Sequence, residues 1–512
     1  MLPRRGREPP APPLDHFLAC PLAPPDAHRV CGRSIPIRSI VPGHPRQPGV
    51  SSVSASPAPK SIPRIRGEIP LLGSLREFAS DRLSFFMRLA REFPDIGAFH
   101  VGPARFYFVN SPTMISTVLA GHGEFFAPST IVRHLKPLFG PNSLLITHGE
   151  PHLEQRRMMA PVFQPRRVAS LDAGMTELGA DTVDGWTQGQ ILSVPEAMTH
   201  LTLRIVGRTL FGVDFKHEAS DLSEAVATCM EHAEHLSTSP IHLPMSWNTP
   251  RNLRARQALD MLSRRMTEMI AQRRQSGRDS GDLLSMMLAH RDEDGTGMDE
   301  EQLRDHCVTL FAAGHETTAV FLAWVWGMLL LNPEVYEKLQ HEVDTVLGDR
   351  LPTAGDIQRM PYMQQVLKET LRLYPPSHMQ GRTVLQDVDI EGYKLRKGDS
   401  LLLSFYVLHR NEQFYPEPER FLPERFTPEQ EKARPKHAYV PFGNGPNVCI
   451  GKYFAMLEAN LLMSLMMQRV RFELMPGQHI TAEPSLTLQL ANFHVRVHRR
   501  GGQGDSRTAL AS

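Results

Sequence analysis

The sequence predicts a mainly helical single domain with a small β region, and two observations support this fold class. Stretches with helical periodicity dominate the chain, and the longest and most apolar of them runs from Met298 to Leu331. Short alternating stretches are fewer; Ile96–Val101 and Phe106–Val109, around Gly102-Pro103, predict a hairpin. With 512 residues, 41% of them hydrophobic, the chain can bury either one large core or those of two or three average domains.

The other elements follow from local signals in chain order. Proline is favoured in the first turn of a helix, so we expect helices to begin near Pro112 and Pro151. Helical patterns continue over 168–212 and through a long helix, rich in Arg and Met, that ends at 274. The segment 361–374 is helical and stops at two prolines. A hairpin is expected at 392–408 and the C-terminal strands at 485–498.

Composition excludes several classes of protein. A net charge of +1 argues against nucleic acid as the principal partner. The cysteines are few, odd in number and unpatterned, which favours neither a disulfide scaffold nor a zinc site. They are Cys20, Cys31, Cys229, Cys307 and Cys449. We therefore expect a reducing, cytoplasmic location.

The first 60 residues differ in kind from the rest. They hold 14 of the 43 prolines, and eight Lys/Arg against three acids, without hydrophobic periodicity. Such a segment cannot bury enough surface to fold, so we expect disordered tails at 1–60 and 503–512, flanking one domain at 61–502. No run of 18 apolar residues occurs in the first 60, so no membrane anchor is expected there. A transit peptide and a misassigned start codon remain open.

The strongest chemical signal is the segment Phe442-Gly-Asn-Gly-Pro-Asn-Val-Cys449-Ile-Gly451. Its glycines allow positive φ angles and close approach to something flat and bulky. Cys449 sits where a helix would begin, so backbone N–H groups and the helix dipole can stabilise its thiolate. A free thiol has a pKa of about 8.5, so a permanent thiolate needs such help or a metal. The spacing alone leaves two interpretations open, a metal ligand and a buried structural cysteine.

Polar residues interrupt the apolar helix. His315-Glu316-Thr317-Thr318 would be costly in lipid, so a buried core helix with a functional interruption is the better interpretation. Ala313 and Gly314 precede Thr317 by one turn, so a flat group could pack on this face. A kink caused by threonine hydroxyls bonding to the preceding turn is compatible with that interpretation.

Two further helices carry charged pairs. His152 and Arg156 are four residues apart and share one helix face. By themselves they favour a solvated basic surface. Glu369 and Arg372 lie opposite the apolar face of their helix, so the pattern alone predicts an exposed ion pair that contributes little to stability.

Three of these segments resemble motifs of one family, cytochrome P-450. The Cys449 segment resembles its haem-binding signature Phe-x-x-Gly-x-(Arg/His)-x-Cys-x-Gly, with Asn447 at the position of the usual Arg or His. Residues 313–318 resemble its oxygen-activation motif. Glu369-x-x-Arg372, followed by Pro423-Glu-Arg425-Phe426, resembles its paired structural motifs. The resemblance covers roughly residues 61–500.

The resemblance implies a site for haem b with Cys449 as the axial thiolate ligand. The residues that it places around the haem are His152, Arg156, Arg382, Phe442 and Asn447. Thr317 and Glu316 would organise proton delivery during oxygen activation. The same resemblance implies that Glu369 and Arg372 form a structural network with Arg425. It also brings the segment Leu490–Phe493 into the substrate pocket.

The implied function is monooxygenation of a lipophilic small molecule with O2. Electrons would come from a separate ferredoxin or flavodoxin with an NAD(P)H reductase, and the protein would act as a monomer. Cationic residues expected around the cysteine side of the haem would attract an acidic partner; they are Arg156, Arg157, Arg166, Lys436 and Lys452. Two alternatives are a haem-thiolate isomerase, dehydratase or peroxygenase that needs no reductase, and a non-catalytic haem sensor.

Overall fold

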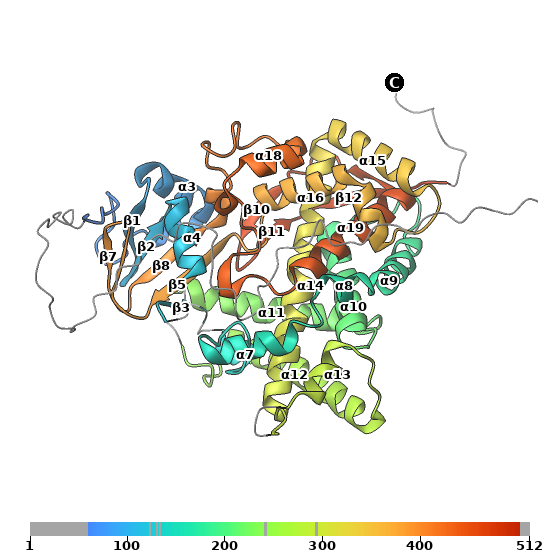
Figure 1. Ribbon diagram of the computed structural model, residues 1–512, viewed down its shortest axis with the longest axis horizontal. Helices are drawn as coiled ribbons and strands as arrows, with labels where there is room; N and C mark the ends of the chain where they lie inside the picture. The colour runs from blue at the N-terminus through green and yellow to red at the C-terminus, as the bar shows by residue number, and fades with distance from the viewer. Residues whose placement is uncertain are drawn as a thin grey trace, which may run out of the picture. The chain divides into compact units, whose positions relative to one another are not determined.

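Helices make up most of the described chain, and the longest of them, α14 (Glu300–Leu331), passes through its centre (Figure 1). This computed structural model describes residues 60–501, apart from 122–123, 130–131, 133–134, 240–242 and 292–294. The two predicted tails therefore lie outside the described residues, except for Lys60.

The helices follow the expected order. Before α14 they are α2 (Leu75–Ser80), α3 (Arg82–Glu92), α4 (Pro112–Ala120), α6 (Lys136–Phe139), α7 (Glu150–Met159), α8 (Pro165–Ala169), α9 (Asp172–Asp184), α10 (Val194–Leu210), α11 (Ala219–Thr238), α12 (Pro250–Ser276) and α13 (Leu283–Ala289). After it come α15 (Pro333–Leu347), α16 (Pro361–Leu373), α17 (Phe405–Leu408), α18 (Pro428–Ala433) and α19 (Lys452–Arg469), with short 3-10 turns at Ala354–Arg359, Pro423–Phe426, Lys436–Ala438 and Gly445–Asn447.

Helix α14 begins with a capping box. The Asp299 carboxylate accepts from the Gln302 N–H at 2.8 Å, and the Gln302 side chain accepts from the Asp299 N–H at 3.0 Å. Helices α10, α12, α16 and α19 all pack against it. Among the described residues it is the one helix long and apolar enough to cross a membrane, but 72% of its most apolar window is buried inside the protein. The expected buried core helix is confirmed.

The strands form four small sheets, of which the largest has the order β1-β2-β8-β5-β3. Its hairpin β1–β2 pairs Ile96 with Val109, as predicted, and β2 runs parallel to β8. The remaining sheets are β4-β12-β9, β10-β11 and β6-β7. The strands are β1 (Ile96–Val101), β2 (Ala104–Val109), β3 (Phe126–Pro128), β4 (Ile191–Ser193), β5 (Met379–Val384), β6 (Val388–Ile390), β7 (Tyr393–Leu395), β8 (Ser400–Ser404), β9 (Val470–Leu474), β10 (Thr481–Pro484), β11 (Leu488–Ala491) and β12 (His494–Arg499).

The prediction of a hairpin at 392–408 was wrong, whereas the expected C-terminal strands at 485–498 are present. The segment 392–408 is not a hairpin, because β7 pairs with β6 across Glu391-Gly392 while β8 joins the largest sheet. The segment 485–498 contains two strands that belong to different sheets. The turn of the β10–β11 hairpin is Ser485–Thr487, whereas Leu490 and Phe493 are buried in the main core. Their apolar side chains are removed from water there, and the expected entry of Leu490–Phe493 into the substrate pocket stays a prediction.

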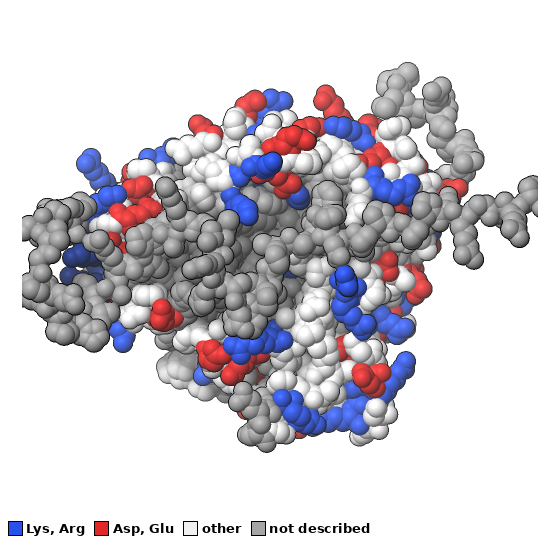
Figure 2. Space-filling view, in the orientation of Figure 1, with Lys and Arg blue, Asp and Glu red and all other residues white. Residues whose placement is uncertain are grey.

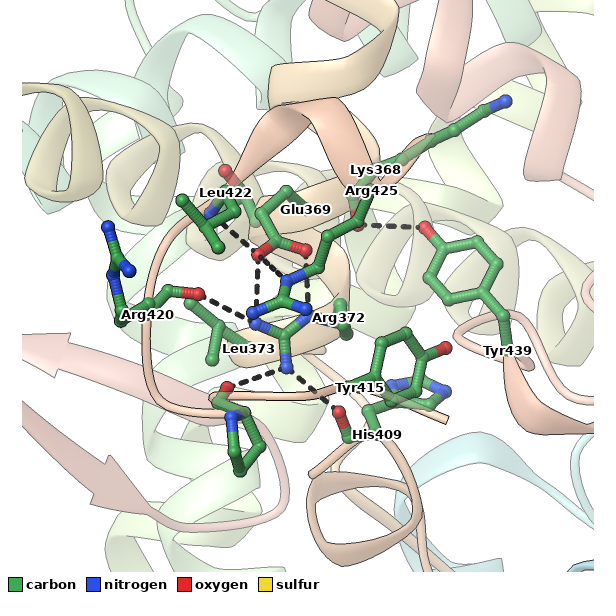
Figure 3. Close-up of polar contacts among 12 residues, drawn as sticks. Lys368, Glu369, Arg372, Leu373, His409, Tyr415, Arg420, Leu422, Arg425 and Tyr439 are labelled. Atoms are coloured by element: carbon green, nitrogen blue, oxygen red, sulfur yellow. Dashed lines mark hydrogen bonds and ion pairs between the residues drawn. The ribbon is translucent and has the colours of Figure 1, made fainter. Parts of the chain in front are cut away.

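The pair Glu369–Arg372 lies in the interior rather than at the surface (Figure 3). Both side chains are 0% exposed, and the guanidinium holds both carboxylate oxygens at 2.7 and 2.8 Å. Its remaining N–H groups donate to backbone carbonyls, among them His409 at 2.9 Å, and Arg425 lies 3.3 Å from the same carboxylate. The pattern-based expectation was wrong, and the structural network implied by the family motif is confirmed.

This network supports the segment that leads to Cys449. The ring of His409 accepts from the Val440 N–H at 3.0 Å, and the Tyr439 hydroxyl donates to the carbonyl of Lys368 at 3.0 Å. Both contacts tie the chain just before the cysteine loop to buried groups around α16. The loop is therefore fixed from the side of the Glu369–Arg372 pair.

Candidate functional site

The cysteine loop is a tight turn fixed at both ends. The Cys449 N–H donates to the carbonyl of Phe442 at 2.9 Å, and Arg156 donates to the carbonyl of Val448 at 2.8 Å. Gly445 has a φ of +68°, and a Cβ there would lie 2.4 Å from the Leu119 carbonyl oxygen. Only glycine fits this close approach, so the predicted positive φ is present at Gly443 and Gly445, while approach to a flat group stays a prediction.

The Cys449 thiol has the environment of a ligand rather than of a packing residue. Burial of the thiol raises its pKa above the usual value, and the Gly451 N–H with the charges of Arg156 and Lys452 offsets only part of this rise. Its side chain nevertheless keeps an exposed surface. Cys229, by contrast, is buried, and burial alone raises its pKa to about 12. The interpretation of Cys449 as a buried structural cysteine does not fit this exposure.

A small-residue face of α14 carries the predicted oxygen-activation residues. Ala313 is exposed although its helix is mostly buried, and Gly314, Glu316 and Thr317 are half-buried. The Thr317 hydroxyl donates to the Ala313 carbonyl at 2.8 Å, and Thr318 bonds likewise to Gly314 at 3.1 Å. The expected bonding of threonines to the preceding turn is therefore present, and it leaves the accessible face intact.

Glu316 points toward the C-terminal hairpin. Its carboxylate accepts from the Thr487 hydroxyl at 3.0 Å. Burial raises the pKa of Glu316, and hydrogen bonds from the side chains of Thr487 and Gln489 oppose this shift. A carboxyl group with a raised pKa next to a threonine on an accessible helix face is suited to proton transfer.

Arg156 and Arg382 form a cationic cluster around His152, and no acidic side chain among the described residues accepts a hydrogen bond from either arginine. His152 is 5% exposed, and burial together with the charges of Arg156 and Arg382 lowers its pKa to about 4. Arg382 is also buried, which lowers its pKa to about 10. Within the described part of the chain, both arginines donate only to uncharged oxygens: Arg156 to Val448, and Arg382 to Gly381 and Gln380.

The expectation of a solvated basic surface at His152 and Arg156 was wrong, because α7 turns these side chains inward. A cavity of about 200 Å³ adjoins the cluster, and its lining includes His148 and Pro128, the strand partner of Arg382. Buried guanidinium groups that lack a counter-charge are suited to bind carboxylates from outside the protein.

Phe442 and Asn447 contribute to the loop in different ways. Phe442 is half-buried against the main core, and its carbonyl accepts from Cys449. Asn447 lies in the 3-10 turn Gly445–Asn447, and its side chain makes no hydrogen bond that the structure records for the described residues. A soft thiol beside cations, a small-residue helix face and unpaired arginines together fit a haem with its iron and propionates.

Sequence reasoning missed two polar residues near α14. Glu458 of α19 is completely buried; burial raises its pKa well above the usual range, and the hydroxyl of Thr318 opposes that shift. Its isolation as an acid inside the apolar run 454–467 was the available signal. Thr487 gave no such signal, because its contact with Glu316 spans 171 positions of the sequence.

The fold and the site define a haem-thiolate protein, and comparison with known families agrees. The cytochrome P-450 family model matches residues 63–494, so the chain belongs to the cytochrome P-450 family. It is similar to the crystal structure of the cytochrome P-450DA haem domain, with a TM-score of 0.80 and 28% identity, over 88% of this chain and 100% of that one.

Two relatives from Streptomyces are similar over most of the chain. Cyclooctat-9-en-7-ol 5-monooxygenase of Streptomyces melanosporofaciens is 33% identical over 438 residues, which cover 84% of this chain and 95% of that protein. Pentalenene oxygenase of Streptomyces avermitilis is 29% identical over 417 residues, with coverages of 81% and 92%. The protein is therefore a haem-dependent monooxygenase that uses O2 and a redox partner to oxidise a lipophilic molecule.

Proposed function

We propose that the substrate is a cyclic terpene hydrocarbon or alcohol that is hydroxylated at a C–H bond. The observation that carries this proposal is the similarity, over about four-fifths of the chain, to cyclooctat-9-en-7-ol 5-monooxygenase and to pentalenene oxygenase. One oxygen atom of O2 enters the substrate. The other leaves as water after two electrons and two protons have been supplied.

Within this proposal, the cofactor is haem b, which supplies the iron at which O2 is reduced. Cys449 holds the iron, and its exposed thiol near Arg156 and Lys452 supports that role. The propionates are bound by His152, Arg156 and Arg382. This role is supported because, among the described residues, these side chains have no acidic partner. Phe442 and Asn447 shape the loop on the cysteine side.

Thr317 and Glu316 are proposed to deliver the protons. The Thr317 hydroxyl donates to the Ala313 carbonyl, so its oxygen lone pairs face the accessible helix surface and can accept a hydrogen bond. The raised pKa of Glu316 lets its carboxyl group keep a proton to a higher pH than an exposed glutamate. A proton can thus be held near the reacting face without bulk water.

We also propose that the electron donor is an acidic ferredoxin or flavodoxin and that the enzyme acts as a cytoplasmic monomer. The basic patch, defined as Arg157, Arg166, Lys436 and Lys452, would face the donor. Arg156 of the expected set donates inward to Val448 instead. Figure 2 shows basic and acidic side chains interspersed on the viewed face of the protein. Within the patch, Arg157 pairs with Glu150 at 2.6 Å, which offsets part of its positive charge.

The substrate proposal can be tested by a binding screen on the haem-loaded protein. Pentalenene and cyclooctat-9-en-7-ol should shift the haem Soret band, and products that carry one added oxygen should form with a surrogate ferredoxin and reductase. Lauric acid serves as a linear control. A Soret shift with lauric acid and none with either terpene would contradict the proposal.

A further inference from the structure

The β10–β11 hairpin contacts the predicted proton-delivery residue Glu316 through two side chains, of which Thr487 is the first. Thr487 lies in the turn Ser485–Thr487 and is 5% exposed, and its hydroxyl donates to the Glu316 carboxylate at 3.0 Å. A buried carboxyl group without a hydrogen-bond partner is costly, so this contact decides where the carboxyl group rests. Thr487 is thus well placed to control the position of the Glu316 carboxyl group.

The turn that carries Thr487 is clamped to the protein core. The next residue, Leu488, donates its N–H to the carbonyl of Pro376 at 2.9 Å. Its own carbonyl accepts from the indole of Trp324 at 2.7 Å, and both Leu488 and Trp324 are at most 1% exposed. Two buried hydrogen bonds on the adjacent residue restrict the backbone of Thr487, so its hydroxyl is held in one place.

Few other hydrogen-bond partners are available to the Glu316 carboxyl group. Its helix neighbours are committed to other groups, because the ring of His315 bonds to the Phe311 carbonyl at 2.8 Å and Thr317 bonds to Ala313. Gln489, on the same hairpin as Thr487, is the second side chain that hydrogen-bonds Glu316. The hairpin, rather than α14, therefore sets the position of the Glu316 carboxyl group.

We propose that Thr487 is a positioning residue for oxygen activation, whose hydroxyl fixes the position of the Glu316 carboxyl group. The inference rests on the proposed role of Glu316 in proton supply. It assigns a function to the β10–β11 hairpin in addition to the place in the substrate pocket that the family resemblance implies for Leu490–Phe493. Loss of the contact should allow the carboxyl group to move and protons to arrive late, so that O2 leaves as hydrogen peroxide instead of oxidising the substrate.

The test compares Thr487→Val, which keeps the side-chain shape but not the donor, with Thr487→Ser, which restores the donor. Thr202→Val is the matched control, because the Thr202 hydroxyl also bonds to this turn of α14, at 2.9 Å from the His315 carbonyl, but does not contact Glu316. Thr487→Ala replaces Thr487→Val if the valine variant fails to fold.

The first readout needs no turnover. The infrared carbonyl stretch of protonated Glu316, isolated by subtracting the spectrum of Glu316→Gln, should move to higher frequency in Thr487→Val, because its carbonyl loses a hydrogen bond. The band should return to its wild-type frequency in Thr487→Ser and keep that frequency in Thr202→Val. An unmoved band in Thr487→Val overturns the contact on which the inference depends.

The second readout is product formed per NADPH, with pentalenene as probe and peroxide measured alongside. Thr487→Val should lower this ratio by roughly three- to ten-fold, as loss of one hydrogen bond would. Thr487→Ser should recover it, and Thr487→Val should add nothing to Glu316→Gln in the double variant. If Glu316→Gln lowers the ratio and Thr487→Val does not, the positioning role of Thr487 is refuted while the proton role of Glu316 stands. If Glu316→Gln leaves it unchanged, the proposed proton role fails as well.

Discussion

Arg372 provides a sharp test of how the fold holds the cysteine loop. The Arg372→Ala change removes a guanidinium that makes five hydrogen bonds, two of them to Glu369 and one to each of the carbonyls of His409, Pro418 and Arg420. Glu369 would remain fully buried with only Arg425, 3.3 Å away, and the Leu422 N–H, at 2.8 Å, as partners. The variant thus leaves a largely uncompensated charge in the interior.

Removal of one partner from a buried ion pair typically costs about 3–5 kcal/mol of unfolding free energy. We therefore expect Arg372→Ala to lower the urea midpoint strongly and to reduce the fraction of protein that binds haem. His409 accepts from Arg372 through its carbonyl and from the Val440 N–H through its ring, so haem loading should fall together with stability.

The control is Arg420→Ala, which removes an exposed guanidinium paired with Glu417 at 2.8 Å. Surface pairs contribute little, so its urea midpoint should stay near that of the wild type. If Arg372→Ala unfolds at the same urea concentration as Arg420→Ala, the reasoning about the buried network is refuted.

Three further predictions concern oxygen activation, pH and electron supply. Thr317→Ala should bind haem normally but release most of its reducing equivalents as peroxide; unchanged product per NADPH would show that Thr317 is structural. Burial lowers the pKa of His409 to about 3 and of His315 to about 4, so the native state binds fewer protons than the unfolded chain, whose histidines have a pKa near 6.5. Stability is therefore complete above pH 6.5 and should fall as the pH drops toward 4, which urea midpoints across this range would check; a flat profile would contradict the shifts. Reduction by ferredoxin should slow as salt shortens the Debye length, which is about 8 Å at physiological ionic strength, and a rate that does not depend on salt would remove the role of the basic patch.

The sequence predicted best those elements whose signals are local. The long apolar stretch identified α14, the two prolines at its end identified α16, and a proline in the first turn identified α4. The Gly102-Pro103 turn identified the β1–β2 hairpin. Strand pairing was harder because alternation does not name a partner. β7 and β8 are close in sequence, yet β7 pairs with β6, while β8 pairs with β2, almost 300 positions earlier.

Predictions for the candidate site also succeeded where the signal was local and failed where it depended on tertiary contacts. The glycine-rich loop around Cys449 is a local signal that the structure explains through Gly445 and Leu119. Charged residues were misplaced when judged by pattern alone, because a hydrophobic pattern assigns every acid and base to the surface. Glu369 and Arg372 neutralise each other inside the protein, and only their tertiary partners reveal it. The contact of Thr487 with Glu316 has no local signal at all.

The thiolate ligand is the central claim, and one spectrum tests it most directly. The haem-loaded protein, reduced and exposed to carbon monoxide, should show the red-shifted Soret band of a cysteine-thiolate haem, and Cys449→Ser should lose it. Cys229→Ser is the matched control and should keep the band, because Cys229 is buried away from the cationic groups that surround Cys449. A wild type without the band, or a Cys449→Ser variant that retains it, would contradict the assignment of Cys449 as the iron ligand.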